Sequence, residues 1–144
     1  MNAFNEYGAI QRMAIRRAAD AFRSQSKIAE EWQPLRFHSE PDYQGAVGEY
    51  DRFRQFFVDA GIELIELPPV EEATLDAIYV RDSAIISPQG LILCNMGRAT
   101  RNFEPPVHGA VIGEGGIPVH GRIEAPGTVE GGDFIWLNEQ AAAI

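Results

Sequence analysis

The residues with the clearest chemical potential are carboxylates in two short groups. Asp76 and Asp82 lie six residues apart in DAIYVRD, and Glu130 and Asp133 flank two glycines in EGGD. Converging carboxylates suit a cation with several N–H donors, and guanidinium binds a carboxylate through two parallel hydrogen bonds. A fully extended segment would separate Asp76 from Asp82 by about 20 Å, at roughly 3.3 Å per residue. The two therefore share a ligand only if the chain bends between them; otherwise they are acids of turns or surface ion pairs.

The glycines of the EGGD motif interrupt a segment that otherwise has the composition of a strand. Glycine weakens a strand, so this pair predicts a bulge or the close approach of a ligand or another backbone. An ordinary turn is an equally good interpretation. A second glycine-rich stretch, GEGGIPVHG at 113–121, is not typical of a nucleotide-binding loop. Such a loop follows a strand and opens a helix, and here the expected order is the reverse.

Cys94 is the only thiol of the chain. A lone cysteine is a nucleophile when a histidine and a positive environment lower its pKa, and His120 is a candidate partner across the expected sheet. The apolar neighbours in LILCNM instead favour an inert buried residue. The three histidines, His38, His108 and His120, form no pair at ligand spacing, so we expect no metal site and no cofactor.

The elements that must position these residues alternate between helix and strand. Apolar residues recur at three- and four-residue steps from Val47 to Ala60, which predicts an amphipathic helix with Asp42 at its start and Gly61 at its end. Residues 62–67 predict a strand ended by two prolines. Residues 7–32 have helical periodicity throughout, with Gly8 as the only strong breaker.

Beyond Pro69 the pattern predicts a hairpin, a helix and two strands. Two apolar runs, 77–86 and 91–95, are separated by the turn residues SPQG, which is typical of an antiparallel hairpin. Proline is favoured in a first helical turn, so a helix is expected from Pro105 or Pro106 to about Ile112. Strands are expected at 117–123 and 128–137. The fold class is mixed α/β, in one domain over residues 1–144.

Composition narrows the classes of partner. The 144 residues include 21 acidic and 12 basic ones, a net charge of −9, and such a surface repels nucleic acid and anionic lipid. No apolar run approaches the roughly 18 residues that span a bilayer. The N-terminus lacks a signal-peptide pattern, and one cysteine excludes an internal disulfide, so a cytoplasmic setting is expected.

Three stretches together resemble the superfamily of arginine deiminases, dimethylarginine dimethylaminohydrolases and amidinotransferases. They are NEYGAIQRMAIRR (5–17), LDAIYVRDSAIISPQGLILCNMGRATRNFEP (75–105) and GRIEAPGTVEGGDFIWL (121–137). The resemblance implies a five-bladed α/β-propeller, the pentein fold, built from strand–hairpin–helix units and cut after about the start of its third blade. It also implies a strand at residues 8–16, against their helical periodicity.

The family's functional residues carry over to matching positions of this chain. Asp82 would hold the substrate guanidinium, and Asp76 would contact the amino-acid end of an arginine-like substrate. Arg101, or less well Arg98, would pair with the substrate carboxylate. Glu130 would bind substrate or orient the catalytic histidine, and Asp133 would support the motif.

The resemblance stops before the reacting groups. In the family, a histidine of a later blade is the general acid/base, and a late cysteine attacks the guanidinium carbon. The chain ends at Ile144 with neither group in place. We therefore expect an inactive part of a guanidino hydrolase or amidinotransferase, a fragment whose open strand edges favour self-association. The alternatives are a non-catalytic propeller that binds partners and a small thiol enzyme built on Cys94 and His120.

Overall fold

The computed structural model describes residues 4–138 and 140–144, and its internal contacts divide the chain into two compact units. The first unit is Gln11–Tyr79. The second unit is Val80–Ile144 together with the segment up to Ile10. The mixed α/β class expected from the sequence is confirmed in both units.

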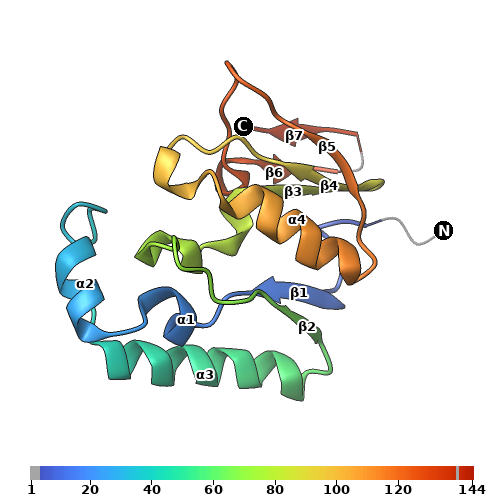
Figure 1. Ribbon diagram of the computed structural model, residues 1–144. Helices are drawn as coiled ribbons and strands as arrows, with labels where there is room; N and C mark the ends of the chain where they lie inside the picture. The colour runs from blue at the N-terminus through green and yellow to red at the C-terminus, as the bar shows by residue number, and fades with distance from the viewer. Residues whose placement is uncertain (1–3, 139) are drawn as a thin grey trace. The chain divides into compact units, whose positions relative to one another are not determined.

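The first unit is a two-stranded parallel sheet whose strands are joined by helices. Strand β1 (Arg12–Ile15) pairs in parallel with β2 (Glu63–Glu66). Parallel neighbours need a long crossover, and helices α1 (Ala18–Phe22), α2 (Gln25–Glu31) and α3 (Tyr43–Asp59) lie along it (Figure 1). The strand implied by the resemblance is thus present but shorter than 8–16, and the continuous helix read over 7–32 is wrong.

Helix α3 begins and ends at the residues that the sequence predicted. The Asp42 carboxylate accepts a hydrogen bond from the Gly45 amide at 2.6 Å, which satisfies one of the free N–H groups of the first turn. Gly61 follows the helix with a φ of +75°, a conformation that glycine adopts without strain. No residue of α3, which is described throughout, is fully buried.

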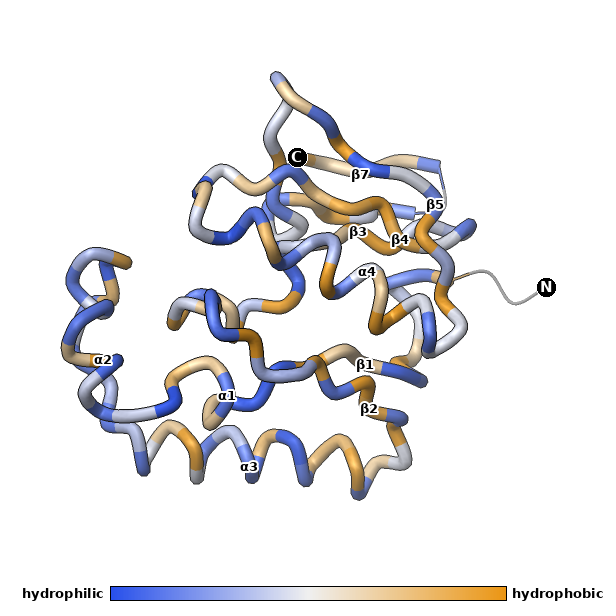
Figure 2. Tube along the Cα trace, in the orientation of Figure 1, coloured by the Kyte–Doolittle hydropathy of each residue, from blue (hydrophilic) through white to orange (hydrophobic). Residues whose placement is uncertain are grey.

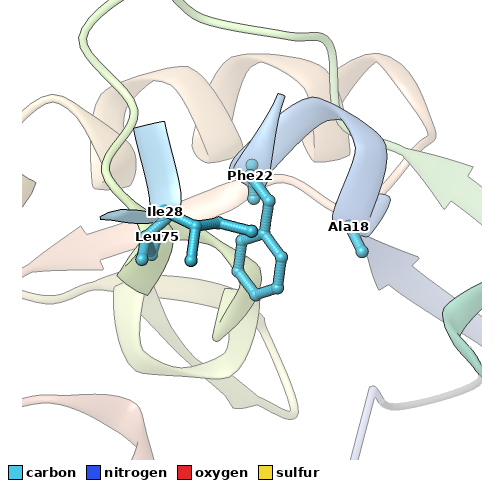
Figure 3. Close-up of a cluster of buried hydrophobic side chains, with 5 residues drawn as sticks. Ala18, Phe22, Ile28 and Leu75 are labelled. Carbon is cyan, nitrogen blue, oxygen red and sulfur yellow. The ribbon is translucent and has the colours of Figure 1, made fainter. Parts of the chain in front are cut away.

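The core of the first unit is small and consists of apolar side chains from α1, α2 and the segment before Tyr79. Figure 3 shows the ring of Phe22 directed toward Ile28 and Leu75. Ile28 and Leu75 have no exposed surface. The inner face of α3 covers this cluster with half-buried side chains, including Val47 and Tyr50. This packing orders the short helices, which would not be stable alone.

The second unit is a three-stranded sheet with one covering helix. Strands β3 (Ala84–Ser87) and β4 (Gly90–Leu93) form the expected hairpin, and β5 (Val119–Arg122) pairs in parallel with β4. Helix α4 (Glu104–Glu114) supplies the crossover and packs on β3 and β4. Figure 2 shows β3 and β4 as largely hydrophobic, which agrees with the burial of most of their residues.

Two predicted strands are wrong over part of their length. Residues 77–83 are not extended: they lie in two short 3₁₀ helices, η1 (Leu75–Ile78) and η2 (Val80–Ser83). The strand expected at 128–137 is replaced by η4 (Gly131–Asp133) and the two-residue strand β6 (Ile135–Trp136), which pairs with β7 (Ala142–Ala143). Arg98 is followed by a further turn, η3 (Ala99–Arg101).

Among the described residues, no helix combines the length and apolar character of a bilayer span. In the same part of the chain, no three histidine, cysteine or acidic side chains are grouped as a metal ion would require.

Candidate functional site

Asp82 lies at the centre of a charged cluster in the second unit. It belongs to η2, directly before β3, and its side chain is 20% exposed. Its Oδ2 accepts a hydrogen bond at 2.8 Å from the guanidinium of Arg101, a residue of η3. Asp82 and Arg101 were both predicted to bind one ligand. In the structure they lie together, but they form an ion pair with each other.

Glu104 completes the cluster. Its two oxygens accept hydrogen bonds from Arg101 Nε and Nη2 at 2.7 and 2.8 Å, a bidentate pair of the kind that guanidinium and carboxylate form best. Glu104 has no exposed surface and Arg101 is 3% exposed. Burial lowers the pKa of Arg101, but the hydrogen bonds and charges of Glu104 and Asp82 outweigh it and raise the pKa above its ordinary value. The arginine is therefore charged at every working pH.

Glu104 was not predicted as a site residue, although its spacing from Arg101 is visible in the sequence. Arg101 and Glu104 are three residues apart in RNFEP, and Pro105 and Pro106 mark a helix start there. Residues at this spacing face each other when the chain coils. The spacing was available in the sequence, but the burial that makes the pair important was not.

The EGGD motif forms a tight turn against η2. A Cβ on Gly131 would lie 2.2 Å from the Arg81 carbonyl oxygen and 2.7 Å from that of Ala84. A Cβ on Gly132 would lie 2.5 Å from Asp82 Oδ1. The close backbone approach predicted from the two glycines is thus confirmed, and the other face of the Asp82 carboxylate lies against this turn.

Arg81 also binds the EGGD turn, through hydrogen bonds to its backbone. Its guanidinium donates to the Gly131 carbonyl at 2.5 Å and to the Phe134 carbonyl at 2.9 Å. It also pairs with Glu6 at 2.9 Å. Because Arg81 precedes Asp82 in the chain, these bonds fix where the Asp82 backbone meets the motif.

Glu130 stands at the start of the η4 turn and is half-buried. Its Oε1 accepts a hydrogen bond from the Gly97 amide at 3.3 Å, which ties the motif to the loop that leads into η3. An isolated bridge between Asn95 and Val129 runs beside it. Glu130 is therefore positioned by the loop that carries Arg98 and Arg101.

The remaining predicted site residues are more dispersed. Asp76 is buried within η1 and belongs to the first unit, whereas Asp82 belongs to the second. The segments that carry them are coiled rather than extended, in η1 and η2. Arg98 is exposed at the start of η3, and Asp133 is exposed at the end of η4.

A pocket of about 300 Å³ opens beside this cluster in the second unit. Its polar lining comes from Asn95, Asn102 and Arg122, and Cys94 also lines it. The predicted site residues do not line it. The remaining lining residues are Leu93, Met96, Pro105, Pro106 and Ile123.

The environment of Cys94 opposes a nucleophilic role. The residue is 5% exposed, and burial raises the pKa of its thiol to about 11, with the charges of Asp82 and Glu130 acting in the same direction. His120 is exposed on β5. A thiol with such a pKa is protonated near neutrality, which is the opposite of an activated cysteine.

A buried serine–histidine pair lies next to the cluster. Ser83 Oγ and His108 Nδ1 are 2.6 Å apart, and Ser83 also donates to the Val80 carbonyl at 2.9 Å. Since the hydroxyl has a single proton, Nδ1 carries the hydrogen that it accepts. Neither side chain is more than 1% exposed. The pair joins η2 to α4 and is closed to substrate.

Comparison with known proteins finds two relatives with low sequence identity, one of which is a characterised enzyme. No protein-family model matches it. An uncharacterised protein of Aeropyrum pernix is 28% identical over 99 residues, which are 67% of this chain and 36% of that protein. The N(G),N(G)-dimethylarginine dimethylaminohydrolase of Pseudomonas aeruginosa is 26% identical over 99 residues, 69% of this chain and 39% of the enzyme.

Solved structures of dimethylarginine dimethylaminohydrolase share the fold. An adduct with 4-chloro-2-hydroxymethylpyridine matches with a TM-score of 0.68 at 23% identity, over 89% of this chain and 46% of that one. A cysteine-to-serine mutant of the Pseudomonas aeruginosa enzyme complexed with citrulline matches with a TM-score of 0.66 at 23% identity, over 88% and 47%. The chain is a distant homologue of this enzyme, and it spans less than half the length of the relatives that it matches.

Proposed function

We propose that the chain is the guanidinium-holding part of a hydrolase that acts on the guanidinium C–N bond of arginine or a methylated arginine. The observation that carries the proposal is the Asp82 carboxylate, fixed by Arg101 on one side and in contact with the EGGD turn on the other. A carboxylate held in this way is suited to a planar cation with paired N–H donors. The homology with dimethylarginine dimethylaminohydrolase supports this ligand over other cations.

In the proposed complex, Asp82 holds the guanidinium and Asp76 contacts the amino-acid end of the substrate. Glu130 binds substrate or orients the histidine, and Asp133 supports the turn. Arg101 donates hydrogen bonds to Asp82 and Glu104 and is 3% exposed, so a substrate carboxylate could bond to it only if the cluster opened. Arg98 is the more accessible of the two arginines.

The chemistry of the whole protein follows the family mechanism. A cysteine thiolate attacks the guanidinium carbon, an amine leaves with a proton from a histidine, and water releases the covalent amidino intermediate. An amine in place of water would give amidino transfer instead. Cys94 is a poor nucleophile because its pKa is raised, and His108 is buried against Ser83. Neither residue is therefore a candidate for the reacting cysteine or histidine.

Calorimetry tests the proposal on the chain as it exists. We expect L-arginine and dimethylarginine to bind, and Asp82→Asn to abolish that binding. Glu114→Gln removes a charge at the exposed end of α4 and should leave binding unchanged. No turnover is expected from the chain alone. Equal binding by wild type and Asp82→Asn would contradict the proposed site.

A non-catalytic binding module is the second candidate. It is favoured by the raised pKa of Cys94 and by the burial of Ser83 and His108, which oppose a nucleophilic role for the thiol and for this serine. Absence of binding by any guanidino compound, with a well-folded chain, would support this alternative.

A further inference from the structure

The charge balance of the Asp82 cluster points to a role for a residue outside the predicted site. Asp82 and Arg101 alone would form a neutral pair, and a neutral pair attracts a further cation weakly. Glu104 adds a second carboxylate to the same guanidinium through two bonds of 2.7 and 2.8 Å. Two carboxylates and one guanidinium leave the cluster with a net charge of −1.

The three side chains differ in their access to solvent. Glu104 has no exposed surface and Arg101 is 3% exposed, so neither carries the excess charge to a ligand. Asp82 is 20% exposed. Its Oδ2 bonds to Arg101, and its Oδ1 is directed at the Gly132 position of the turn. The excess negative charge is therefore presented at Asp82.

We propose that Glu104 is a positioning residue: it shares the charge of Arg101 with Asp82, so that Asp82 keeps an excess of negative charge for a guanidinium ligand. The inference rests on the proposed function, because it assigns Asp82 to that ligand. Arg101 then serves as a bridge that orients Asp82: its Nε and Nη2 donate to Glu104, and its Nη1 donates to Asp82 Oδ2. Selectivity for a charged head group over a neutral one of the same shape is the property that Glu104 supplies.

The test compares two ligands that differ only in head-group charge. L-arginine carries a guanidinium, and L-citrulline carries a neutral ureido group of nearly the same shape. NMR titration of the wild-type chain should show tighter binding of arginine. Glu104→Gln should lower the ratio of arginine to citrulline affinity by roughly tenfold or more, because one unit charge is lost close to the ligand. Glu114→Gln, the same change at the exposed end of the same helix, should leave the ratio unchanged.

A double variant separates charge from structural damage. Arg101→Gln combined with Glu104→Gln removes one positive and one negative charge, so the cluster again has a net charge of −1. The ratio should recover toward the wild-type value even if both affinities fall. A purely structural role for Glu104 predicts the opposite, a further loss without recovery.

The outcomes distinguish this inference from the proposed function. If wild type prefers arginine and Glu104→Gln leaves the ratio unchanged, the role of Glu104 is wrong and the function stands. If wild type binds guanidinium chloride at Asp82 but not arginine, the proposed substrate is wrong. Glu104 is then judged by whether its substitution weakens the binding of guanidinium. Binding of neither ligand overturns both.

Discussion

At the scale of single residues, the second unit depends on polar groups that are buried and fully matched. Arg101 is charged at every working pH, and Glu104 and Asp82 supply the opposite charge on both sides. Removing one partner of such a network leaves a buried charge without compensation, which costs about 3–5 kcal/mol. The buried hydrogen bond between Ser83 of η2 and His108 of α4 belongs to the same unit.

Ser83→Ala should destabilise the second unit by about 1–3 kcal/mol, because the His108 Nδ1–H loses its acceptor in a site closed to water. Urea unfolding measured by tryptophan fluorescence checks this. A Trp32→Phe background leaves Trp136 as the reporter, and Trp136 belongs to the second unit. Thr128→Ala, at an exposed position of the same unit, should change the free energy of unfolding little. Equal effects of the two substitutions would contradict the role of the pair.

Cys94 should react with iodoacetamide about a hundredfold more slowly than a free thiol near pH 7.5, since its pKa is raised to about 11 and only the thiolate reacts. The rate should rise with pH until the thiol ionises near that value. Mass spectrometry of the labelled chain measures the rate, and labelling in concentrated urea gives the unhindered control. Rapid reaction of the folded chain near neutrality would revive the thiol-enzyme alternative.

The sequence predicted that certain charged residues would lie close together, but it did not predict the bonds between them. Asp82, Arg101 and the EGGD motif were assigned to one site, and the structure brings them into one unit. It did not predict that Arg101 bonds to Asp82, because pairing across 19 residues depends on where η3 lies relative to η2. Glu104 was missed for the same reason: spacing shows a neighbour, and only packing shows that it is buried.

At the scale of elements, glycines allow the close packing of the segments around Asp82. The turn η4 approaches η2 so closely that a side chain has no room at Gly131. Helix α4 packs closely on the sheet at Gly109, where a Cβ would lie 3.0 Å from the Leu93 side chain. At Gly131 the neighbours are backbone carbonyls, and at Gly109 they are side chains.

Gly131→Ala should destabilise the second unit by about 1–3 kcal/mol or more, because the new methyl group would overlap two backbone carbonyls that cannot rotate away. Gly113→Ala is the matched control. Its Cβ would have no neighbour within 4 Å, and alanine in α4 should stabilise by about 0.5–1 kcal/mol. The same tryptophan-reported unfolding measures both. If Gly131→Ala left the free energy of unfolding unchanged, η2 and η4 would be able to move apart at little cost.

Elements with strong periodicity were predictable, and those set by tertiary contacts were not. Helix α3 has regular spacing and a capping aspartate, so its start and end follow from local chemistry. Residues 77–83 have the composition of a strand but form 3₁₀ turns. Leu75 and Ala77 are buried in the first unit, and the chain enters the second unit at Val80. Amino-acid composition alone does not show that the chain passes from one compact unit to the other within these six residues.

At the scale of the whole molecule, the chain reproduces a part of a larger fold. It covers 46% of a solved dimethylarginine dimethylaminohydrolase at a TM-score of 0.68. The five-bladed propeller implied by the resemblance remains a prediction: the described residues form a two-stranded sheet in the first unit and, in the second, a three-stranded sheet and the short β6–β7 pair. Large apolar side chains stay exposed in both units, among them Phe53 and Phe56 on α3 and Ile135 and Leu137 near β6.

Such surfaces should make the isolated chain self-associate, because exposed apolar patches and short unpaired strand edges favour contact between copies. Sedimentation velocity over a range of concentrations should show species larger than the monomer. Phe56, 67% exposed on α3, is the most accessible aromatic of the first unit. Phe56→Glu should shift the distribution toward monomer, while Val58→Ala, a smaller change on the same helix, should have less effect. A monomer at every concentration, with a cooperative melt, would show that these surfaces are compatible with an independent fold.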